Sequence, residues 1–487
     1  MSNENTVLTR YPDYEVCIGM EVHVQLATKS KIFCSCSNVA VAQANSTICP
    51  ICSGYPGVLP VLNAQVVEYA VMAALATNSH INLYNEFSRK HYFYPDLPKG
   101  YQITQGELPI CEHGFVRIKT EGGEDKKIRL FRIHMEEDAG KNTHDAAQGR
   151  SLVDLNRAGT PLIEIVSYPD LSSAGEVRAY LKSLRNTVMY LGICSGNMED
   201  GAFRADTNIS VRKKGAAELG VKCELKNINS FKFIADAIEY EVERQIELIE
   251  AGGRVTQQTR LWDAKERKTY SMRSKEGAAD YRYFTDPDLP PVCLTQEFID
   301  DIAAKMPELP DVLFDRLISE YSLSEYEAEI LVNDKSVADY YQQAYSYQGS
   351  ALLINWVMRD VLGFCKESKI AIENIALRPV MLAELIALIE SGKINSKIAQ
   401  DVFKDIIKSG ESPRDYIARN GLEQLDDEGK IETIVIELLA NNAQQVAAYR
   451  GGQVKLFGFF TGQMMVLTKG RGNPQKIQQL LKKHLDS

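Results

Sequence analysis

The sequence has few of the features that mark membrane, secreted or disulfide-stabilised proteins. Among 487 residues there are only two Trp, seven His and ten Cys. So few cysteines cannot build a disulfide scaffold, and in a reducing compartment clustered ones are better explained as metal ligands. No apolar run approaches the length of about 18 residues that a membrane-spanning helix needs. The first twenty residues also lack the apolar core of a signal peptide. We therefore expect a cytoplasmic location and no membrane partner.

Common catalytic signatures are absent as well. The chain has no G-x-x-x-x-G-K-[ST] loop, no kinase-type glycine-rich loop and no G-x-S-x-G elbow. The formal net charge is −10, so an RNA partner would have to be held by local basic patches rather than by the overall field.

The length suggests about three domains at roughly 150 residues each. Residues 1–292 are rich in Gly, Pro, aromatic residues and short alternating segments, and the proline-rich stretch 285–291 marks their end. From residue 296 to about 410 the sequence changes to helical patterns, with long runs that contain no proline. Residues 411–487 form a third part that ends in a basic tail.

Hydrophobic periodicity predicts an α+β fold in the first part. Alternation with period two predicts strands over 18–26, 131–136, 203–212 and 221–226. Apolar residues at three-four spacing predict helices over 174–191 and 234–249. Because one face of each strand is polar, the sheet is expected to be largely antiparallel.

Four cysteines form the first candidate site. Their pattern is C-x-C, twelve residues, then C-x-x-C: Cys34, Cys36, Cys49 and Cys52. Two close pairs on two turns can place four thiolates tetrahedrally around Zn²⁺. The first pair is one residue shorter than the usual C-x-x-C, and the alternative is four free thiols. We predict a structural zinc knuckle over residues 34–52 with no open coordination position.

Acidic residues on the predicted strands form the second candidate site. They are Glu21, Glu136, Glu137, Glu164 and Asp206, with His23 beside the first. Glu164 interrupts an apolar segment, where an acid is costly to bury unless it is paired or metal-bound. Carboxylates that converge from several strands would suit Mg²⁺, which prefers oxygen ligands. The alternative is unconnected acids on solvated strand faces. Glu136 and Glu137 would reach one site only if their strand ends or bulges there.

Basic residues supply two weaker signals. Lys99, Lys141 and Arg157 lie in loops beside Gly or Pro and could meet phosphates, although ordinary surface charge explains them equally well. Residues 450–487 contain seven Lys or Arg and one acid. Such a tail can follow an RNA backbone, or it can simply be a solvated terminal helix. The apolar stretch 456–466 within it predicts a buried helix.

Several long segments together resemble one protein family, the B subunits of the tRNA-dependent aspartyl/glutamyl amidotransferase. They are GMEVHVQL, HYFYPDLPKGYQITQ, IHMEEDAGK, NRAGTPLIEIVSYPD, KNINSF, TRLWD, MRSKEGAADYRYFTDPDL, GFFTGQ and TKGRGNP, in the family's order. The resemblance implies a cradle-like catalytic domain, a helical domain and a C-terminal tail domain similar to the YqeY proteins.

The resemblance also implies an activity, the ATP-dependent conversion of Glu on tRNA(Gln), or Asp on tRNA(Asn), to Gln or Asn. In this family the B subunit holds the charged tRNA and phosphorylates the aminoacyl carboxylate. The A subunit is a glutaminase that supplies ammonia, and the small C subunit wraps the pair. The reaction would need ATP and Mg²⁺, since an anionic carboxylate attacks an anionic triphosphate.

Matching the family's motifs residue by residue places its metal and kinase site on Glu21, His23, Glu136, Glu137, Glu164 and Asp206. The four cysteines match the zinc-bearing members. In the tail, Lys469 and Arg471 remain as candidate tRNA contacts.

Some positions depart from the family's pattern. Ser195, Ala202 and Ala205 replace the usual Asp, Ser and Cys around Asp206, and Gln453 and Val466 stand where Lys is frequent.

Two other classes of protein compete with this interpretation. A non-catalytic, zinc-containing protein that binds tRNA or serves assembly would need its cysteines and tail, whereas its acids would be dispensable. A metal-dependent hydrolase acting alone would be expected to show a His-rich pattern, which seven scattered histidines do not provide.

Overall fold

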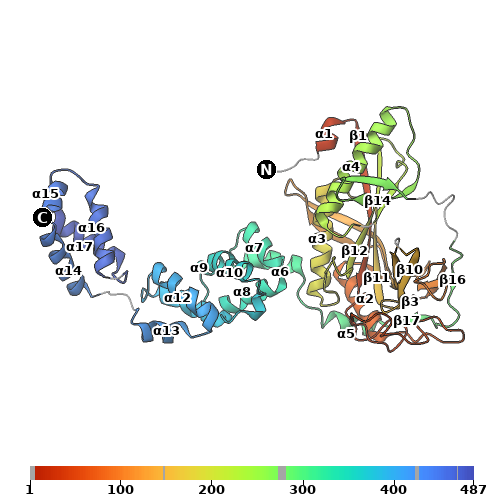
Figure 1. Cartoon of the computed structure of the whole chain (residues 1–487), viewed down its shortest axis with the longest axis horizontal. Helices are drawn as coiled ribbons and strands as arrows, with labels where there is room; N and C mark the ends of the chain where they lie inside the picture. The colour runs from red at the N-terminus through yellow and green to blue at the C-terminus, as the bar shows by residue number, and fades with distance from the viewer. Residues whose placement is uncertain are drawn as a thin grey trace. The chain divides into compact units, whose positions relative to one another are not determined.

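A computed structural model of the chain describes residues 6–145, 148–226, 228–272, 281–422, 427–468 and 470–486. It divides into two compact units, Met1–Asp315 and Arg316–Ser487 (Figure 1). This boundary falls within the predicted helical part at 296–410, and the three-part division itself remains a prediction.

The first unit combines strands and helices in the order that the alternating segments predict. Its helices are α1 (Thr6–Arg10), α2 (Ala64–Ala76), α3 (Ala174–Tyr190), α4 (Phe231–Glu250), α5 (Gln296–Ala303) and α6 (Pro310–Ser319), the last of which crosses the unit boundary. Its longer strands are β1 (Tyr14–Gln25), β7 (Phe115–Lys119), β8 (Asp125–Glu137), β9 (Lys141–Asp145), β10 (Arg150–Asp154), β11 (Pro161–Ser167), β12 (Phe203–Lys213) and β14 (Gln258–Asp263). Its shorter strands are β2 (His80–Ile81), β3 (Tyr84–Asn85), β4 (Ser88–His91), β5 (Tyr101–Thr104), β6 (Cys111–Glu112), β13 (Cys223–Lys226), β15 (Lys268–Ser271), β16 (Phe284–Thr285) and β17 (Val292–Cys293).

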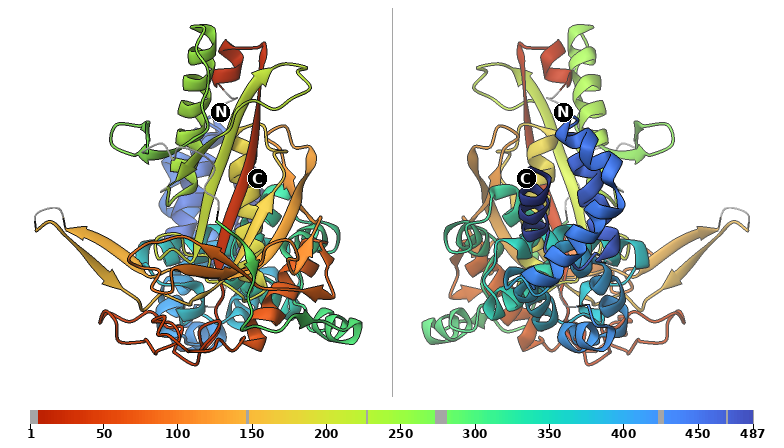
Figure 2. Two further views of the ribbon diagram at one scale, coloured as in Figure 1. Left: turned by 90° about the vertical axis from the view of Figure 1, so that its right-hand side faces the viewer. Right: turned by 90° about the vertical axis from the view of Figure 1, so that its left-hand side faces the viewer.

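One large sheet organises this unit. Its strand order is β15-β14-β13-β12-β1-β11-β8-β6-β2, with β7 paired to β8. Every pairing is antiparallel except β13 with β14. The long strands β12, β1, β11 and β8 lie side by side at its centre (Figure 2). The α+β fold with a largely antiparallel sheet is therefore confirmed.

Helices cover one face of this sheet because the apolar phase of each strand points toward them. Ser173 and Ser230 cap the starts of α3 and α4 through their hydroxyls, which accept hydrogen bonds from Glu176 N and Phe233 N. The apolar stripes of both helices join the strand residues in one buried core, of which the central examples are Ile18, Met20, Val22, Ile163, Ile165, Val177, Leu181, Ile234 and Ile238. The polar phase of the strands consequently faces away from these helices.

Smaller elements complete the first unit. Strands β16, β4 and β5 form a three-stranded sheet, in which β4 and β5 lie at the two ends of the HYFYPDLPKGYQ segment. Strands β9 and β10 pair only with each other among the described residues. They form an arm that projects from the body of the unit (Figure 2).

The second unit is helical. Beyond α6 it contains α7 (Glu325–Val332), α8 (Lys335–Tyr347), α9 (Leu352–Asn355), the π-helix η1 (Trp356–Val361), α10 (Leu362–Ser368), the 3-10 helix η2 (Ile372–Asn374), α11 (Pro379–Glu390), α12 (Ser396–Ser409), α13 (Pro413–Asn420), α14 (Glu428–Asn441), α15 (Ala443–Arg450), α16 (Leu456–Leu467) and α17 (Pro474–Asp486). Among the described residues, none of the helices combines the length and apolar character needed to cross a bilayer.

The helix predicted over 456–466 forms, but its burial was predicted wrongly. In α16 only Phe460 and Met464 are buried, and they pack with α14 and α17. Val466 and Leu467 at its end are 71% and 52% exposed. The neighbouring helices α14, α15 and α17 cover only one side of α16, so a single stripe of its apolar residues is buried.

A buried ion network anchors α4 to the edge of the large sheet. The Glu241 carboxylate is fully buried. It accepts hydrogen bonds from Arg244 (2.6 and 3.0 Å), Gln245 (2.9 Å) and Thr269 (3.0 Å), and it lies 3.2 Å from Arg260. Burial opposes ionisation, but the hydrogen bonds outweigh it and lower the pKa of Glu241.

Replacing Glu241 should destabilise the first unit strongly. Glu241→Ala leaves the buried Arg260 and the partly buried Arg244 without their carboxylate partner, which we expect to cost about 3–5 kcal/mol. Because the folded-state pKa is depressed, this stabilisation is present at neutral pH and lost as the pH falls below the ordinary value of about 4.3. In calorimetry of the full chain, Glu241→Ala should therefore melt at a lower temperature than wild type, and the difference between the two melting temperatures should become smaller in acid. Glu247→Ala, on an exposed position of the same helix, should melt like wild type; equal melting of Glu241→Ala would contradict the role of the network.

Candidate metal-binding and catalytic site

The polar face of the large sheet brings together three predicted site residues from three strands. His23 on β1 lies directly opposite Glu164 on β11, and Glu136 projects from β8. The His23 Nε2 atom is 3.5 Å from Glu136 Oε1 and 3.8 Å from Glu164 Oε2. One ligand atom from each residue falls within 4.8 Å of the others, the spacing of donors around a single cation. We name this set the first group.

His134, which the sequence reasoning did not select, completes the same row. It lies opposite Glu164 on the neighbouring strand β8, and its Nε2 atom is 2.9 Å from Glu164 Oε2 and 3.6 Å from Glu136 Oε2. Burial alone would lower the pKa of His134, but the charges of Glu164 and Glu136 outweigh it and raise the pKa to about 9. In return, the His134 charge holds the pKa of Glu164 well below its usual range, against the effect of burial.

Lys90 on β4 is a second residue that sequence reasoning missed. Its ammonium group lies 4.8 Å from the centre of the Tyr281 ring and 5.9 Å from that of Tyr92. Burial works against its charge, but Tyr283 and the carboxylates of Glu136 and Glu164 outweigh it and raise the pKa of Lys90. The first group therefore faces a lysine that stays charged at neutral pH.

A second group forms two residues further along the same face. Glu21 on β1 lies opposite Asp206 on β12, and Glu224 on β13 joins them within 4.8 Å. Lys226 bridges Asp206 and Glu224 at 2.9 Å each. Burial and the charges of Glu164 and Glu224 raise the pKa of Glu21. This group is all-carboxylate, which is the donor set that Mg²⁺ prefers.

Glu137, predicted to share the site, lies elsewhere. Strand β8 keeps its regular alternation up to its last residue, so Glu136 and Glu137 point to opposite sides. The Glu137 carboxylate accepts hydrogen bonds from Lys99 Nζ and, at 2.9 Å, from Ile103 N. Five of the six predicted residues are thus divided between the two groups, and Glu137 lies outside both of them.

The other predicted loop cations, Arg157 and Lys141, form no ion pair with the first or the second group within the described part of the chain. Arg157 donates to Ala139 O at 3.0 Å and Gly140 O at 2.7 Å, and lies 3.4 Å from Asp138. Lys141 is exposed at the start of the projecting arm. Their predicted contacts with nucleotide remain predictions.

The four cysteines meet as the spacing predicts. One sulfur from each lies within 4.8 Å of the others, and Cys49 Sγ and Cys52 Sγ are 3.9 Å apart. A tetrahedral site with Zn–S bonds of about 2.3 Å has sulfur–sulfur edges of roughly 3.8 Å, so the residues fit Zn²⁺. Hydrogen bonds from the Cys34 thiol and the Cys49 backbone N–H, together with the Lys31 charge, outweigh burial and lower the pKa of Cys52 to about 4. A thiolate is the form that binds the metal.

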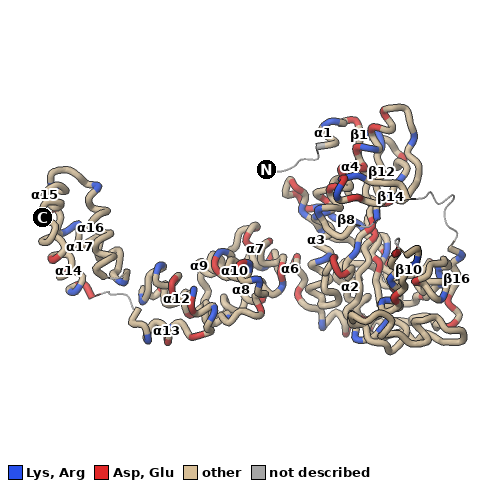
Figure 3. Tube along the Cα trace, viewed as in Figure 1, with Lys and Arg blue, Asp and Glu red and all other residues tan. Residues whose placement is uncertain are grey.

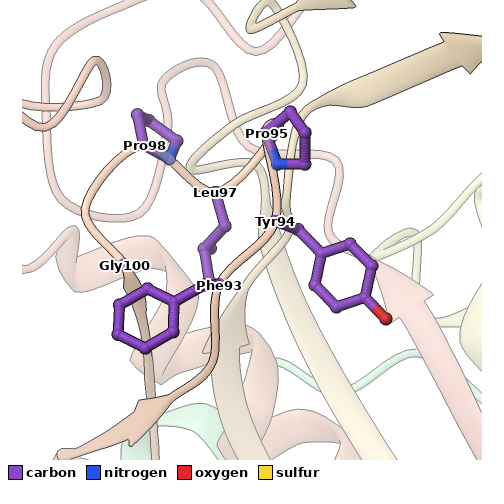
Figure 4. A pocket seen from close by; sticks show the side chains of 6 residues that line it. All are labelled: Phe93, Tyr94, Pro95, Leu97, Pro98 and Gly100. Carbon is purple, nitrogen blue, oxygen red and sulfur yellow. The ribbon is translucent and has the colours of Figure 1, made fainter. Parts of the chain in front are cut away.

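An open depression lies beside Lys99, in the loop between β4 and β5. It is lined by Phe93, Tyr94, Pro95, Leu97, Pro98 and Gly100 (Figure 4). Phe93 is 86% exposed. None of the predicted metal ligands lines this depression.

The basic tail is partly engaged in contacts of its own. Arg471 donates to Gly421 O at 2.9 Å, Arg450 to Leu485 O at 3.1 Å, and Lys483 pairs with Glu432 at 2.9 Å. Lys469 lies outside the described residues. Basic and acidic positions are interspersed along the second unit (Figure 3), and tRNA binding by Lys469 and Arg471 remains a prediction.

A sheet face that gathers carboxylates, histidines and lysines around two cation-sized groups defines a candidate metal-dependent catalytic protein. Comparison with known proteins identifies its family. Residues 16–300 match the family model described as the GatB/GatE catalytic domain, and residues 339–485 match the one described as the GatB domain.

Relatives along almost the whole chain agree with these matches. The B subunit of the aspartyl/glutamyl-tRNA(Asn/Gln) amidotransferase of Myxococcus xanthus is 50% identical over 97% of this chain and 99% of its own length. Proteins of the same name from Solidesulfovibrio magneticus and Persephonella marina are 51% and 48% identical over 97% of this chain, which covers 99% and 100% of their lengths. The chain belongs to the family of tRNA-dependent amidotransferase B subunits.

The cysteine geometry predicts that zinc supports the structure rather than the chemistry. Cys49→Ser removes one of four ligands, so the purified chain should lose most of its zinc and melt at a lower temperature. Metal analysis by mass spectrometry and thermal melting provide the measurement. The control is Cys293→Ser, which changes an exposed cysteine and should keep wild-type values. Unchanged zinc content in Cys49→Ser would show that the ligands are misassigned.

Proposed function

We propose that the two groups on the polar sheet face form the site at which ATP phosphorylates the side-chain carboxylate of Glu-tRNA(Gln), Asp-tRNA(Asn) or both, and at which ammonia then amidates it. Family membership supports the overall activity, that of the B subunit of a glutamine-dependent tRNA amidotransferase. The site within the chain rests on one observation, the convergence of carboxylates from β1, β8, β11, β12 and β13 on one face.

The spacing of the two groups suits a triphosphate substrate. His23 and Glu21 are two residues apart on β1, which places them roughly 7 Å apart on the same face. An extended polyphosphate can therefore meet cation-binding groups at both positions. When bound there, Mg²⁺ would screen and align the negative charges of the carboxylate and the triphosphate.

The chain's own residues set the electrostatics of the two chemical steps. In the first, a side-chain carboxylate oxygen attacks the γ-phosphorus, the bond to the β-phosphate oxygen breaks, and ADP leaves. In the second, ammonia attacks the acyl carbon and inorganic phosphate leaves with the C–O electron pair. Lys90 and Lys226 carry positive charges beside the first and second groups. We assign to them the stabilisation of phosphate oxygens as these bonds change.

His134 has a supporting role in this scheme. Its buried charge lies against Glu164 and Glu136, so it orients both carboxylates and favours the ionised form of Glu164. Metal ligands are commonly held in their binding orientation by a neighbouring residue of this kind, which contacts the ligand but not the metal.

The remaining partners follow from the chemistry of the reaction. Ammonia would come from the glutaminase, which is the A subunit, with the small C subunit completing the heterotrimer, and the chain would hold the charged tRNA. The cysteine knuckle would hold a structural Zn²⁺. A cytoplasmic location remains a prediction. The alternative of a non-catalytic tRNA-binding protein leaves the pairing of acids across the central strands without a purpose.

Glu136→Gln should separate the two activities of the assembled heterotrimer. The substitution removes a charge from the first group, so ADP formation dependent on Glu-tRNA(Gln) and Mg²⁺ should fall about 100-fold or more. Glutamine hydrolysis by the glutaminase partner should persist, because its site is on another chain. Radiolabelled ATP turnover and glutamate release measure the two activities.

Glu107→Gln is the matched control, since Glu107 is exposed and belongs to neither group. It should retain both activities. ATP turnover by Glu136→Gln at the wild-type rate would contradict the proposed site and favour the non-catalytic alternative.

A further inference from the structure

A lysine is buried against the cysteine cluster. The Lys31 side chain is 0% exposed. Its Nζ atom donates to Thr47 O at 3.0 Å and to Leu155 O at 3.5 Å, and it lies 3.6 Å from Cys52 Sγ. Within the described part of the chain, no carboxylate oxygen lies within ion-pair distance of Lys31.

A buried ammonium without a counter-charge is costly. Two carbonyl groups satisfy two of its three protons, but carbonyls are neutral, and removing an uncompensated charge from water costs several kcal/mol in proteins. The nearest groups able to carry negative charge are the sulfurs. Four thiolates around Zn²⁺ carry a net charge of −2, and one ammonium group halves it. The positive charge of the lysine and the negative charge of the zinc-bound thiolates therefore compensate each other.

We propose that Lys31 is the counter-charge that stabilises the tetrathiolate zinc site, and that it also ties this site to the segment leading into β11. The proposal rests on the zinc-binding role given to the cysteines above, and it adds a residue to that role. Lys31 is not a ligand; it acts on the metal through Cys52 and through the position of the surrounding loops.

The second half of the proposal follows from the hydrogen bonds around Leu155. Asn156 Oδ1 accepts from Ser46 N at 2.8 Å and from Thr47 N at 2.9 Å, and Asn45 Oδ1 accepts from Leu155 N at 2.7 Å. These bonds fasten the loop between the two cysteine pairs to residues 153–156.

The tether continues toward the catalytic face. Ile32 N donates to Gly159 O at 3.0 Å, two residues before β11 begins at Pro161. The zinc knuckle is thus attached at several points to the segment that delivers Glu164 to the first group. Lys31 is the member of this tether that contacts the cysteine cluster and the segment at once.

The test compares zinc affinity in the full chain for Lys31→Met and Lys29→Met. Methionine keeps the length of the side chain without its charge, and Lys29 is an exposed lysine two residues away. In competition with a zinc-binding dye, Lys31→Met should bind zinc with a dissociation constant 10- to 100-fold larger than wild type, roughly the effect of losing a residue that supports a metal ligand. Lys29→Met should have the wild-type dissociation constant. With Co²⁺ in place of Zn²⁺, Lys31→Met should keep the absorption of a four-thiolate tetrahedral site, because all four ligands remain.

Other results would overturn the proposal in distinguishable ways. Equal zinc affinity for Lys31→Met and Lys29→Met would remove the role of Lys31 and leave the zinc site standing. A wild-type chain that takes up no zinc would overturn the zinc assignment and the proposal together. Should Lys31→Met fold poorly, Lys31→Arg serves as the second variant: it retains the charge and should hold zinc more tightly than Lys31→Met, and equal loss in both would show that charge is not the reason.

Discussion

The structure depends above all on the pairing register of strand β1. In this register His23 meets Glu164 on one side, and Glu21 meets Asp206 on the other. Since side chains alternate across a sheet, a slip of one residue would turn these polar groups into the core and expose Val22 and Val24 instead. The helices α3 and α4 fix the register by covering the apolar face, so the same packing that forms the core also assembles the candidate site.

Charge compensation is the second theme of the molecule. The acids that the sheet gathers are expensive to bury, and each set has a cation beside it. His134 and Lys90 accompany the first group, Lys226 the second, and Lys31 the cysteine cluster. Under the proposed function the chain binds the polyanions ATP and tRNA, for which positive charge close to the candidate metal-binding acids is favourable. The charge of His134 favours the ionised form of Glu164 before any substrate arrives.

Much of the fold was predictable because its signals are local. Alternation predicted β1, β8, β12 and β13 but not the central strand β11, and the three-four stripes predicted α3 and α4. The local pattern failed where burial depends on distant neighbours. Nothing in the composition of α16 says that only one side of it is covered. His134, Glu224 and Lys226 stood on polar strand positions in the sequence, but only the register shows which acids they face.

The sequence by itself determined the family, the α+β class, the cysteine set and most of the acids of the candidate site, because motif spacing and hydrophobic periodicity are written in neighbouring residues. The tertiary structure alone decided how those residues are grouped. It divided the acids between two groups, left Glu137 with Lys99 instead, and buried Lys31 against Cys52. These relations join residues from separate strands and loops, and their distances are set by strand register and packing, for which a single sequence carries no direct signal.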